Sequence, residues 1–432
     1  MHHFRYLGRQ LFCEGVSVEA LAEKFGTPLY LYSQQTLTDH FKRLDTALGP
    51  IDHLICFAMK ANSNLSVMRV LANLGSGFDV VSAGELQRVI AAGGDPRKCV
   101  FAGVAKTEAE IEFALRQGIY SLNCESEPEI QRINQVARRL RKVAPIAVRV
   151  NPNVEAHTHA KITTGTYENK FGIAFEDIEG VYARASKLGN LRLRGLHMHI
   201  GSQLTQAKPY ERAVTKLLPL VKKLTANYGL EFFSPGGGLG IVYNPALASG
   251  AADWWQSPAA KGLMTPATYA KKLLPLLQPL GLKILIEPGR FIVGNAGILV
   301  TRVEYVKRTG KKNFVIVDAA MNDLVRPALY DSYHEIVPVV KKNGAAVSSD
   351  VVGGICESAD YFCKDRPLPK VGAGDRLALL SAGAYSSVMA SNYNTRALTP
   401  EILVHGKKFA VARRRQKMEA IWADEAVAPW LK

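Results

Sequence analysis

The stretch His53-Leu54-Ile55-Cys56-Phe57-Ala58-Met59-Lys60-Ala61-Asn62-Ser63 decides the fold, because it is the first of a series of similar stretches. A short apolar run at 53–57 leads into a lysine, and a polar turn and an amphipathic segment at 66–74 follow. An apolar run bounded by turn residues is typical of a buried strand. The stretch therefore predicts a strand that ends near Lys60 and is followed by a helix.

Further apolar runs of the same kind follow, with amphipathic segments between them. The runs are 53–57, 77–81, 99–103, 120–123, 146–150, 193–199, 230–233 and 282–286. Repeated strand–helix units in this number are typical of a (β/α)8 barrel, or TIM barrel, in the α/β class. An open doubly wound sheet shares the alternation, but no G-x-G-x-x-G opens the first helix, so the barrel is favoured.

The pattern changes outside the barrel segment. After about residue 287, runs rich in β-branched residues alternate with turns, which predicts a β-sandwich or β-barrel domain. The runs expected to form its strands are 300–306, 313–317, 335–340, 345–352, 376–380 and 402–404. The aromatic-rich run Leu29–Tyr32 could join that domain as a strand, and residues 246–264 are expected to form a surface insertion. We expect an N-terminal segment at 1–35 that contributes to the β domain, a barrel at 36–288 and a C-terminal β domain at 289–432.

Composition narrows the class of protein. The 432-residue chain has a net charge of +16, but its basic residues are scattered, so nucleic-acid binding is not expected. Its six cysteines form no C-x-x-C pair, which favours free thiols in a reducing compartment and argues against a zinc site. No signal-peptide region or membrane-length apolar run is present, so we expect a cytoplasmic protein that does not enter a membrane.

Polar residues and glycines mark the carboxyl ends of the predicted barrel strands. Because these ends share one face, which holds the active site in such barrels, the residues are expected to meet there. The set comprises Lys60, Asp79, Asn151, His197, His199, Ser202, Gly236–Gly240, Glu287 and Arg290. Packing alone does not require such a set.

Lys60 and the glycine loop suggest a phosphorylated carbonyl cofactor. A lysine at the mouth of a buried strand is poorly solvated, which favours the neutral amine that a Schiff base needs. The loop 236–240 lets backbone N–H groups approach an anion closely, and Ser202 and Arg290 add donors for a phosphate. A surface lysine closing a strand and a flexible turn are the structural alternatives.

Glu287 and two histidines could hold the ring of such a cofactor. Glu287 closes an apolar run, where a carboxylate could face a pyridine nitrogen and keep it protonated, or could pair with Arg290. His197 and His199 alternate along one strand and so point the same way. Either could stack on a planar cofactor, and a metal pair is disfavoured because no third ligand follows at a suitable spacing.

Three later clusters carry reactive or charged side chains. Arg326 and Tyr330 share a face if their segment is helical, and arginine suits bidentate binding of a carboxylate. Cys356 and Glu357 place a thiol beside a carboxylate. Tyr385 lies in a turn of small residues and could reach a phosphate or a ring. The structural alternatives are that Cys356 is a buried, inert cysteine and that Tyr385 is a packing residue.

These residues lie in motifs that resemble one family across nearly the whole chain. The chain resembles the diaminopimelate decarboxylases, pyridoxal-phosphate enzymes of the alanine-racemase-like barrel group. The matching stretches are GTPLYLYS (26–33), FAMKANSN (57–64), FDVVSAGEL (78–86), KFGI (170–173), HMHIGSQ (197–203), GGGLGIVY (236–243), EPGR (287–290), MNDLVRPALY (321–330), CESADYF (356–362) and GAYSSVMASNYN (383–394). Several of them are shared with ornithine and arginine decarboxylases, whereas MNDLVRPALY and CES are more particular to this family.

The resemblance implies that pyridoxal 5'-phosphate is the cofactor and that Lys60 holds it as an imine. Glu287 would bind the pyridine nitrogen and His199 would stack on the ring. The cofactor-binding set would be Lys60, Asp79, His199, Ser202, Gly237, Gly238, Glu287, Pro288, Gly289, Arg290 and Tyr385. The catalytic set would be Lys60, Cys356, His199 and Glu287, with Cys356 delivering a proton after CO2 departs.

The resemblance also implies a substrate and an assembly. Arg290, Arg326, Tyr330, Glu357 and Tyr385 would bind meso-diaminopimelate, which would be decarboxylated to L-lysine. The CES segment would reach into a partner's barrel, so a homodimer with shared active sites is expected. A related ornithine, arginine or lysine decarboxylase, a racemase, and a non-catalytic regulatory homologue remain alternatives.

Overall fold

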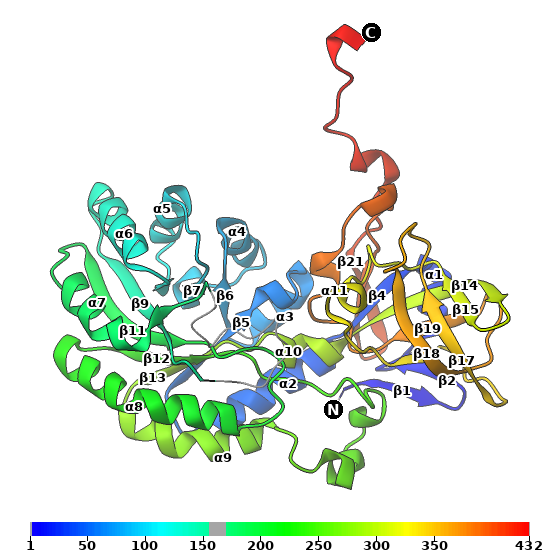
Figure 1. Ribbon diagram of the computed structural model, residues 1–432, viewed down its shortest axis with the longest axis horizontal. Helices are drawn as coiled ribbons and strands as arrows, with labels where there is room; N and C mark the ends of the chain where they lie inside the picture. Colours follow the sequence, from blue (N-terminus) through cyan, green and yellow to red (C-terminus); the bar gives the residue numbers. More distant parts are fainter. Residues whose placement is uncertain (1, 155–169, 432) are drawn as a thin grey trace. The chain divides into compact units, whose positions relative to one another are not determined.

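The computed structural model describes residues 2–154 and 170–431. The chain forms two compact units, which we call the barrel unit and the β unit (Figure 1). The barrel unit comprises Leu37–Ile241 and Gln256–Val293, and the β unit comprises Met1–Thr36, Val242–Trp255 and Gly294–Lys432.

The barrel unit is built on a closed parallel sheet, which confirms the predicted (β/α)8 barrel. Its strands, in order, are β5 (His53–Ala58), β6 (Gly77–Val80), β7 (Cys99–Phe101), β8 (Ser121–Cys124), β9 (Ala144–Asn151), β11 (Leu191–Met198), β12 (Phe232–Gly236) and β13 (Lys283–Ile286). Each strand pairs in parallel with the next, and β13 pairs with β5 to close the ring. The short β10 (Ile173–Ala174) adds to β9.

Helices alternate with the strands, and several of them begin at side-chain caps that the sequence supplies. The barrel helices are α2 (Gln34–Leu48), α3 (Leu65–Asn73), α4 (Ala83–Ala91), α5 (Glu108–Arg116), α6 (Glu127–Arg139), α7 (Ile178–Ala185), α8 (Lys208–Tyr228) and α9 (Pro266–Leu277). The hydroxyl of Ser82 accepts the N–H of Glu85, and Thr107 forms a capping box with Glu110. Among the helices of the described residues, none is long and apolar enough to cross a bilayer.

The β unit contains a mixed sheet and a small antiparallel one. The mixed sheet contains β4 (Leu29–Ser33), β14 (Gly297–Arg308), β15 (Asn313–Val317), β16 (Ile336–Pro338), β17 (Ala346–Val352), β18 (Tyr361–Pro369), β19 (Arg376–Leu379), β20 (Glu401–His405) and β21 (Lys408–Arg413). The small sheet contains β1 (Phe4–Leu7), β2 (Gln10–Cys13) and β3 (Val16–Ser17). The early strand β4 pairs with both β14 and β20, as the aromatic-rich run suggested.

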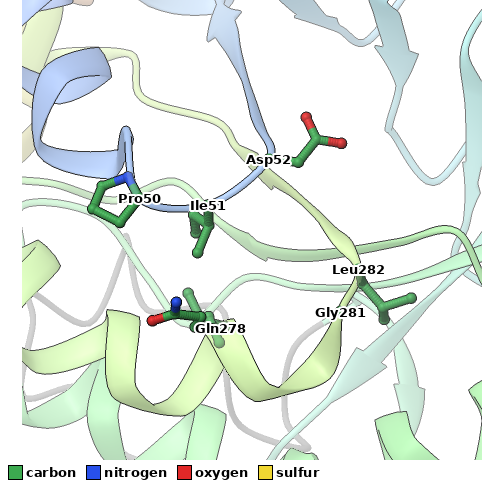
Figure 2. Close-up of a pocket in the computed structure, with 7 residues that line it drawn as sticks. Pro50, Ile51, Asp52, Gln278, Gly281 and Leu282 are labelled. Atoms are coloured by element: carbon green, nitrogen blue, oxygen red, sulfur yellow. The ribbon is translucent and has the colours of Figure 1, made fainter.

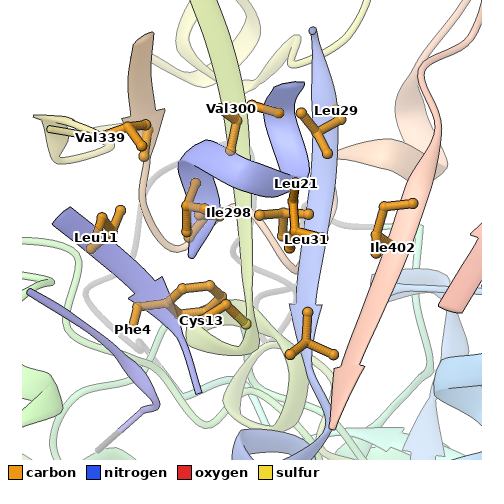
Figure 3. Close-up of a cluster of buried hydrophobic side chains, with 14 of the residues drawn as sticks. Phe4, Leu11, Cys13, Leu21, Leu29, Leu31, Ile298, Val300, Val339 and Ile402 are labelled. Atoms are coloured by element: carbon orange, nitrogen blue, oxygen red, sulfur yellow. The ribbon is translucent and has the colours of Figure 1, made fainter. Parts of the chain in front are cut away.

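A single apolar cluster ties the amino-terminal residues to the later strands of the β unit. Leu29 and Leu31 of β4 pack with Ile298 and Val300 of β14 and with Ile402 of β20 (Figure 3). The small sheet and α1 (Val18–Phe25) add Phe4, Leu11, Cys13 and Leu21 to the same cluster. The first strands of the chain therefore belong to the core of the β unit, since burying these side chains is what stabilises the cluster.

Candidate active site

Lys60 lies at the carboxyl end of β5, in the short turn η1 (Met59–Ala61). Its Nζ is 2.7 Å from Oδ2 of Asp79, which lies on the neighbouring strand β6. The Lys60 side chain is 42% exposed, whereas the Asp79 side chain is buried, so solutes can reach an amine whose position the carboxylate fixes. Burial raises the pKa of Asp79, and the positive charge of Lys60 opposes that rise.

Glu287 follows β13 and is held inside the barrel by two partners. His197 Nε2, from β11, lies 2.9 Å from Oε2, and the hydroxyl of Ser234, from β12, donates to Oε1 over 2.9 Å. Burial alone would raise the pKa of Glu287, but His197, Lys60 and Ser234 outweigh burial and lower the pKa to about 2. Glu287 is therefore ionised at neutral pH and can accept a charge-assisted hydrogen bond from a cationic ring nitrogen.

His199 directly follows β11 and is neutral. The backbone N–H of Gly237 donates to its Nδ1 over 3.2 Å, so the ring proton is carried by Nε2. Burial, and then the positive charges of Arg149 and Lys60, lower the pKa of His199 well below its usual value. A half-buried, uncharged imidazole is suited to stacking on a planar ring.

Two side chains that can donate hydrogen bonds to an anion lie side by side: Ser202, in the loop after β11, and Arg290, at the start of α10 (Arg290–Val293). Arg290 Nη2 donates to the Ser202 hydroxyl over 3.1 Å. Gly238 has a φ of +104°, and a Cβ there would lie 2.2 Å from the carbonyl oxygen of Gly201, so only glycine fits. The barrel unit thus brings Lys60, Asp79, His199, Ser202, Gly237, Gly238, Glu287, Pro288, Gly289 and Arg290 to the ends of its strands.

The predicted substrate residues Arg326 and Tyr330 lie in the β unit, at the two ends of α11 (Arg326–Tyr330). The segment is helical, as their spacing required. Arg326 is buried, and its Nη2 donates to the Ser332 hydroxyl over 3.2 Å. Its guanidinium carbon lies 5.0 Å from the centre of the Tyr243 ring. The guanidinium is therefore held in one orientation by its own unit.

Cys356 and Glu357 lie on an exposed loop of the β unit, beside a second loop. The Tyr393 hydroxyl donates to Oε2 of Glu357 over 3.1 Å, and the backbone N–H of Cys356 donates to Oδ1 of Asn394 over 3.4 Å. Cys356 is the exposed member of six free cysteines. Tyr385 is half-buried in a separate turn, with a φ of +56°.

Some polar residues near these groups were not assigned roles from the sequence. Arg149, at the end of β9, is paired with Glu125 over 2.8 Å, with both side chains buried, and supplies the charge felt by His199. Ser234 is a polar residue in an otherwise apolar, fully buried strand, which was the available signal. No cluster of three or more potential metal ligands occurs within residues 2–154 and 170–431.

A pocket of about 250 Å³ opens at the other end of the barrel (Figure 2). It is lined by Pro50, Ile51, Asp52, Leu277, Gln278, Gly281 and Leu282. These residues directly precede β5 and β13 or lie near the end of α9, so the pocket is at the amino end of the strands. It is separate from the Lys60 site.

Comparisons with known proteins define the class first. Residues 34–294 match the family model described as pyridoxal-dependent decarboxylase, pyridoxal binding domain, so the barrel is that of a pyridoxal-dependent decarboxylase. The chain is 48% identical to the diaminopimelate decarboxylase of Vibrio cholerae, over 99% of this chain and 100% of the relative. It is 46% identical to that of Pseudomonas aeruginosa, over 99% of this chain and 100% of the relative.

Solved structures with a similar fold are also diaminopimelate decarboxylases. The diaminopimelate decarboxylase of Helicobacter pylori complexed with L-lysine has a TM-score of 0.87 and 40% identity, covering 94% of this chain and 98% of that chain. The enzyme of M. jannaschii in complex with L-lysine has a TM-score of 0.91 and 34% identity, covering 100% of both chains. The chain belongs to the diaminopimelate decarboxylase family.

Proposed function

We propose that the chain decarboxylates meso-2,6-diaminopimelate to L-lysine and CO2, the last step of lysine biosynthesis. The observation that carries this proposal is that an accessible Lys60 amine and an ionised, buried Glu287 lie at the same end of the barrel. Two solved relatives named diaminopimelate decarboxylase hold L-lysine, which supports the choice of product.

The residues of the barrel unit fit pyridoxal 5'-phosphate. Lys60 would bind the aldehyde, Glu287 the pyridine nitrogen and His199 a face of the ring. The anion donors would hold the phosphate, with Asp79 positioning Lys60. The residues proposed to surround the phosphate are Ser202, Gly237, Gly238, Pro288, Gly289 and Arg290 of the barrel unit, together with Tyr385 of the β unit.

When bound, the cofactor would supply an aldehyde for the substrate amine and a ring that accepts the electron pair released with CO2. Glu287 would keep the ring nitrogen protonated, because an ionised buried carboxylate strongly favours a cation beside it. His199 would cover a face of the ring and exclude water from it. Lys60 would hold the cofactor aldehyde through its amine.

We assign substrate specificity to side chains that would bind the end of the substrate farthest from the reacting carbon. Arg290, Arg326 and Tyr330 would bind the distal carboxylate, and Glu357 the distal ammonium, with Tyr385 nearby. A site built to pair both charges discriminates against diamines and monocarboxylates that leave one of its groups unpaired. This would separate the chain from relatives that act on ornithine or arginine.

Cys356 is assigned the delivery of a proton to the substrate carbon that has lost CO2. Its thiol lies on an exposed loop, where it is accessible to the active site of a second subunit. We therefore propose a homodimer whose active sites combine residues of both subunits. The buried free thiols of the other cysteines favour a reducing compartment, and we propose the cytoplasm.

A substrate panel tests the proposal. Holoenzyme should release CO2 from meso-diaminopimelate at least about 100-fold faster, as kcat/KM, than from ornithine, arginine or lysine. Activity confined to ornithine or arginine would assign the chain to a related decarboxylase. Absence of CO2 release from every compound, with cofactor bound, would favour a non-catalytic homologue and refute the proposal.

A further inference from the structure

The β unit contains a buried histidine that none of the proposed roles uses. His334 Nδ1 lies 2.8 Å from the carbonyl oxygen of Leu380, and its Nε2 lies 2.8 Å from Nη1 of Arg326. A carbonyl oxygen can only accept and a guanidinium can only donate, so Nδ1 carries the proton and Nε2 offers its lone pair to Arg326. The two contacts together select one neutral tautomer of His334.

The turn that follows α11 places His334 beside Arg326, at the start of the same helix. Asp331 adopts a φ of +52° and ends the helix, and the N–H of Ser332 then donates to the carbonyl oxygen of Arg326. The Ser332 hydroxyl accepts from Nη2, while His334 accepts from Nη1. Both terminal nitrogens of Arg326 are thus held by the turn that follows its own helix.

A ring completes the arrangement. Tyr243 lies 5.0 Å from the guanidinium carbon of Arg326, and its ring centre is 5.5 Å from that of His334 at an interplanar angle of 84°. The Arg366 guanidinium donates to the backbone carbonyl of His334, which fixes the histidine itself. The plane of the Arg326 guanidinium is consequently set by neighbours of the same unit.

We propose that His334 is a positioning residue for substrate recognition, which sets the guanidinium plane of Arg326 so that it can grip the distal carboxylate. This inference rests on the proposed function. Bidentate recognition of a carboxylate requires a planar fork in a defined orientation, and an arginine that is already ordered loses less entropy on binding. His334 itself does not touch the reacting atoms.

Kinetics of His334→Leu and His334→Gln test the proposal. The leucine removes the acceptor, so KM for meso-diaminopimelate should rise roughly 10- to 100-fold. Because the reacting carbon is untouched, kcat should change less than about threefold and the holoenzyme absorbance should not change. Glutamine supplies an acceptor oxygen and should recover most of the loss. His2→Leu changes another buried histidine of the same unit, whose ring bonds the backbone carbonyl of Ala246 and the backbone N–H of Phe4, and should leave KM unchanged.

Two ligands sharpen the test in the holoenzyme. L-lysine keeps the carboxylate distal to the carbon that loses CO2, whereas 1,5-diaminopentane has none. The affinity for L-lysine, measured by titration calorimetry, should fall in His334→Leu by the same factor as that by which KM rises. The affinity for 1,5-diaminopentane should be unchanged.

Two outcomes would overturn the inference: equal affinity of wild type and His334→Leu for L-lysine, or equal weakening of both ligands. An active wild type with either outcome refutes only the role of His334. A wild type that releases no CO2 from meso-diaminopimelate refutes the proposed function instead.

Discussion

His197 and Glu287, 90 positions apart in the sequence, are joined by a 2.9 Å hydrogen bond inside the barrel. Their side chains are 2% and 5% exposed. A carboxylate can only accept, so His197 Nε2 donates, and Ser234 donates to the second carboxylate oxygen. The protein itself therefore orients the acid proposed to face the cofactor ring.

This arrangement predicts a pH dependence of stability. The pKa of Glu287 is lowered from 4.5 to about 2, against the effect of burial, by His197, Lys60 and Ser234. A depressed pKa contributes stability that is complete above about pH 4.5 and is lost as the pH falls toward 2. As the pH is lowered from 5 to about 3, the melting temperature of Glu287→Gln should therefore fall less steeply than that of wild type. Parallel melting curves for the two proteins across this range would contradict the assignment.

The same substitution should impair chemistry more than binding. Glu287→Gln cannot hold a positive ring nitrogen, so kcat should fall about 100-fold or more while KM changes little. Visible absorbance should show that cofactor is still bound through Lys60. A variant with bound cofactor and wild-type kcat would remove Glu287 from the mechanism.

Substitution of Asp79 should have opposite effects on protein stability and on cofactor binding. The pKa of Asp79 is raised by burial, and its Oδ1 has no hydrogen-bond partner in the described part of the chain. Asp79→Asn should raise the melting temperature of cofactor-free protein by about 2–4 °C at pH 7, because a buried charge is removed. It should also weaken pyridoxal phosphate binding, since Lys60 loses the group that holds its amine. Unchanged cofactor affinity would show that Asp79 does not position Lys60.

The proposed sharing of active sites between two subunits predicts complementation between two inactive variants. Cys356→Ala and Lys60→Ala should each be inactive alone, because each lacks one essential group. When the two are unfolded together and refolded as mixed dimers, about a quarter of wild-type activity should return, because half of the dimers carry one intact site. Size and mass measurements would verify that mixed dimers formed, and mixed dimers without activity would place Cys356 and Lys60 in the same subunit's site.

The barrel was predictable because each strand is a short apolar run between turn residues, and all eight runs became strands. The small sheet β1–β3 was not, because its strands have two to four residues and little periodicity. β18 was also missed, since Tyr361–Pro369 contains charged residues and two prolines. That composition suits its partly exposed place at the end of the mixed sheet, which local pattern does not distinguish from a loop.

The site was predictable where residue type and strand position coincide. Lys60, Glu287 and His199 each end or follow a buried strand, so their meeting at one end of the barrel followed from the fold alone. The sequence did not predict two hydrogen bonds, that of His197 with Glu287 and that of His334 with Arg326. A histidine in an apolar segment can equally be a packing residue. Only coordinates give the partner of each ring nitrogen.

The central claim, that Lys60 carries the aldehyde cofactor, is tested most directly by borohydride reduction followed by peptide mass spectrometry. We expect one reduced pyridoxal phosphate adduct per chain, located on the peptide that contains Lys60, and complete loss of CO2 release from meso-diaminopimelate. An adduct on a different lysine, or full activity of Lys60→Ala, would contradict the account.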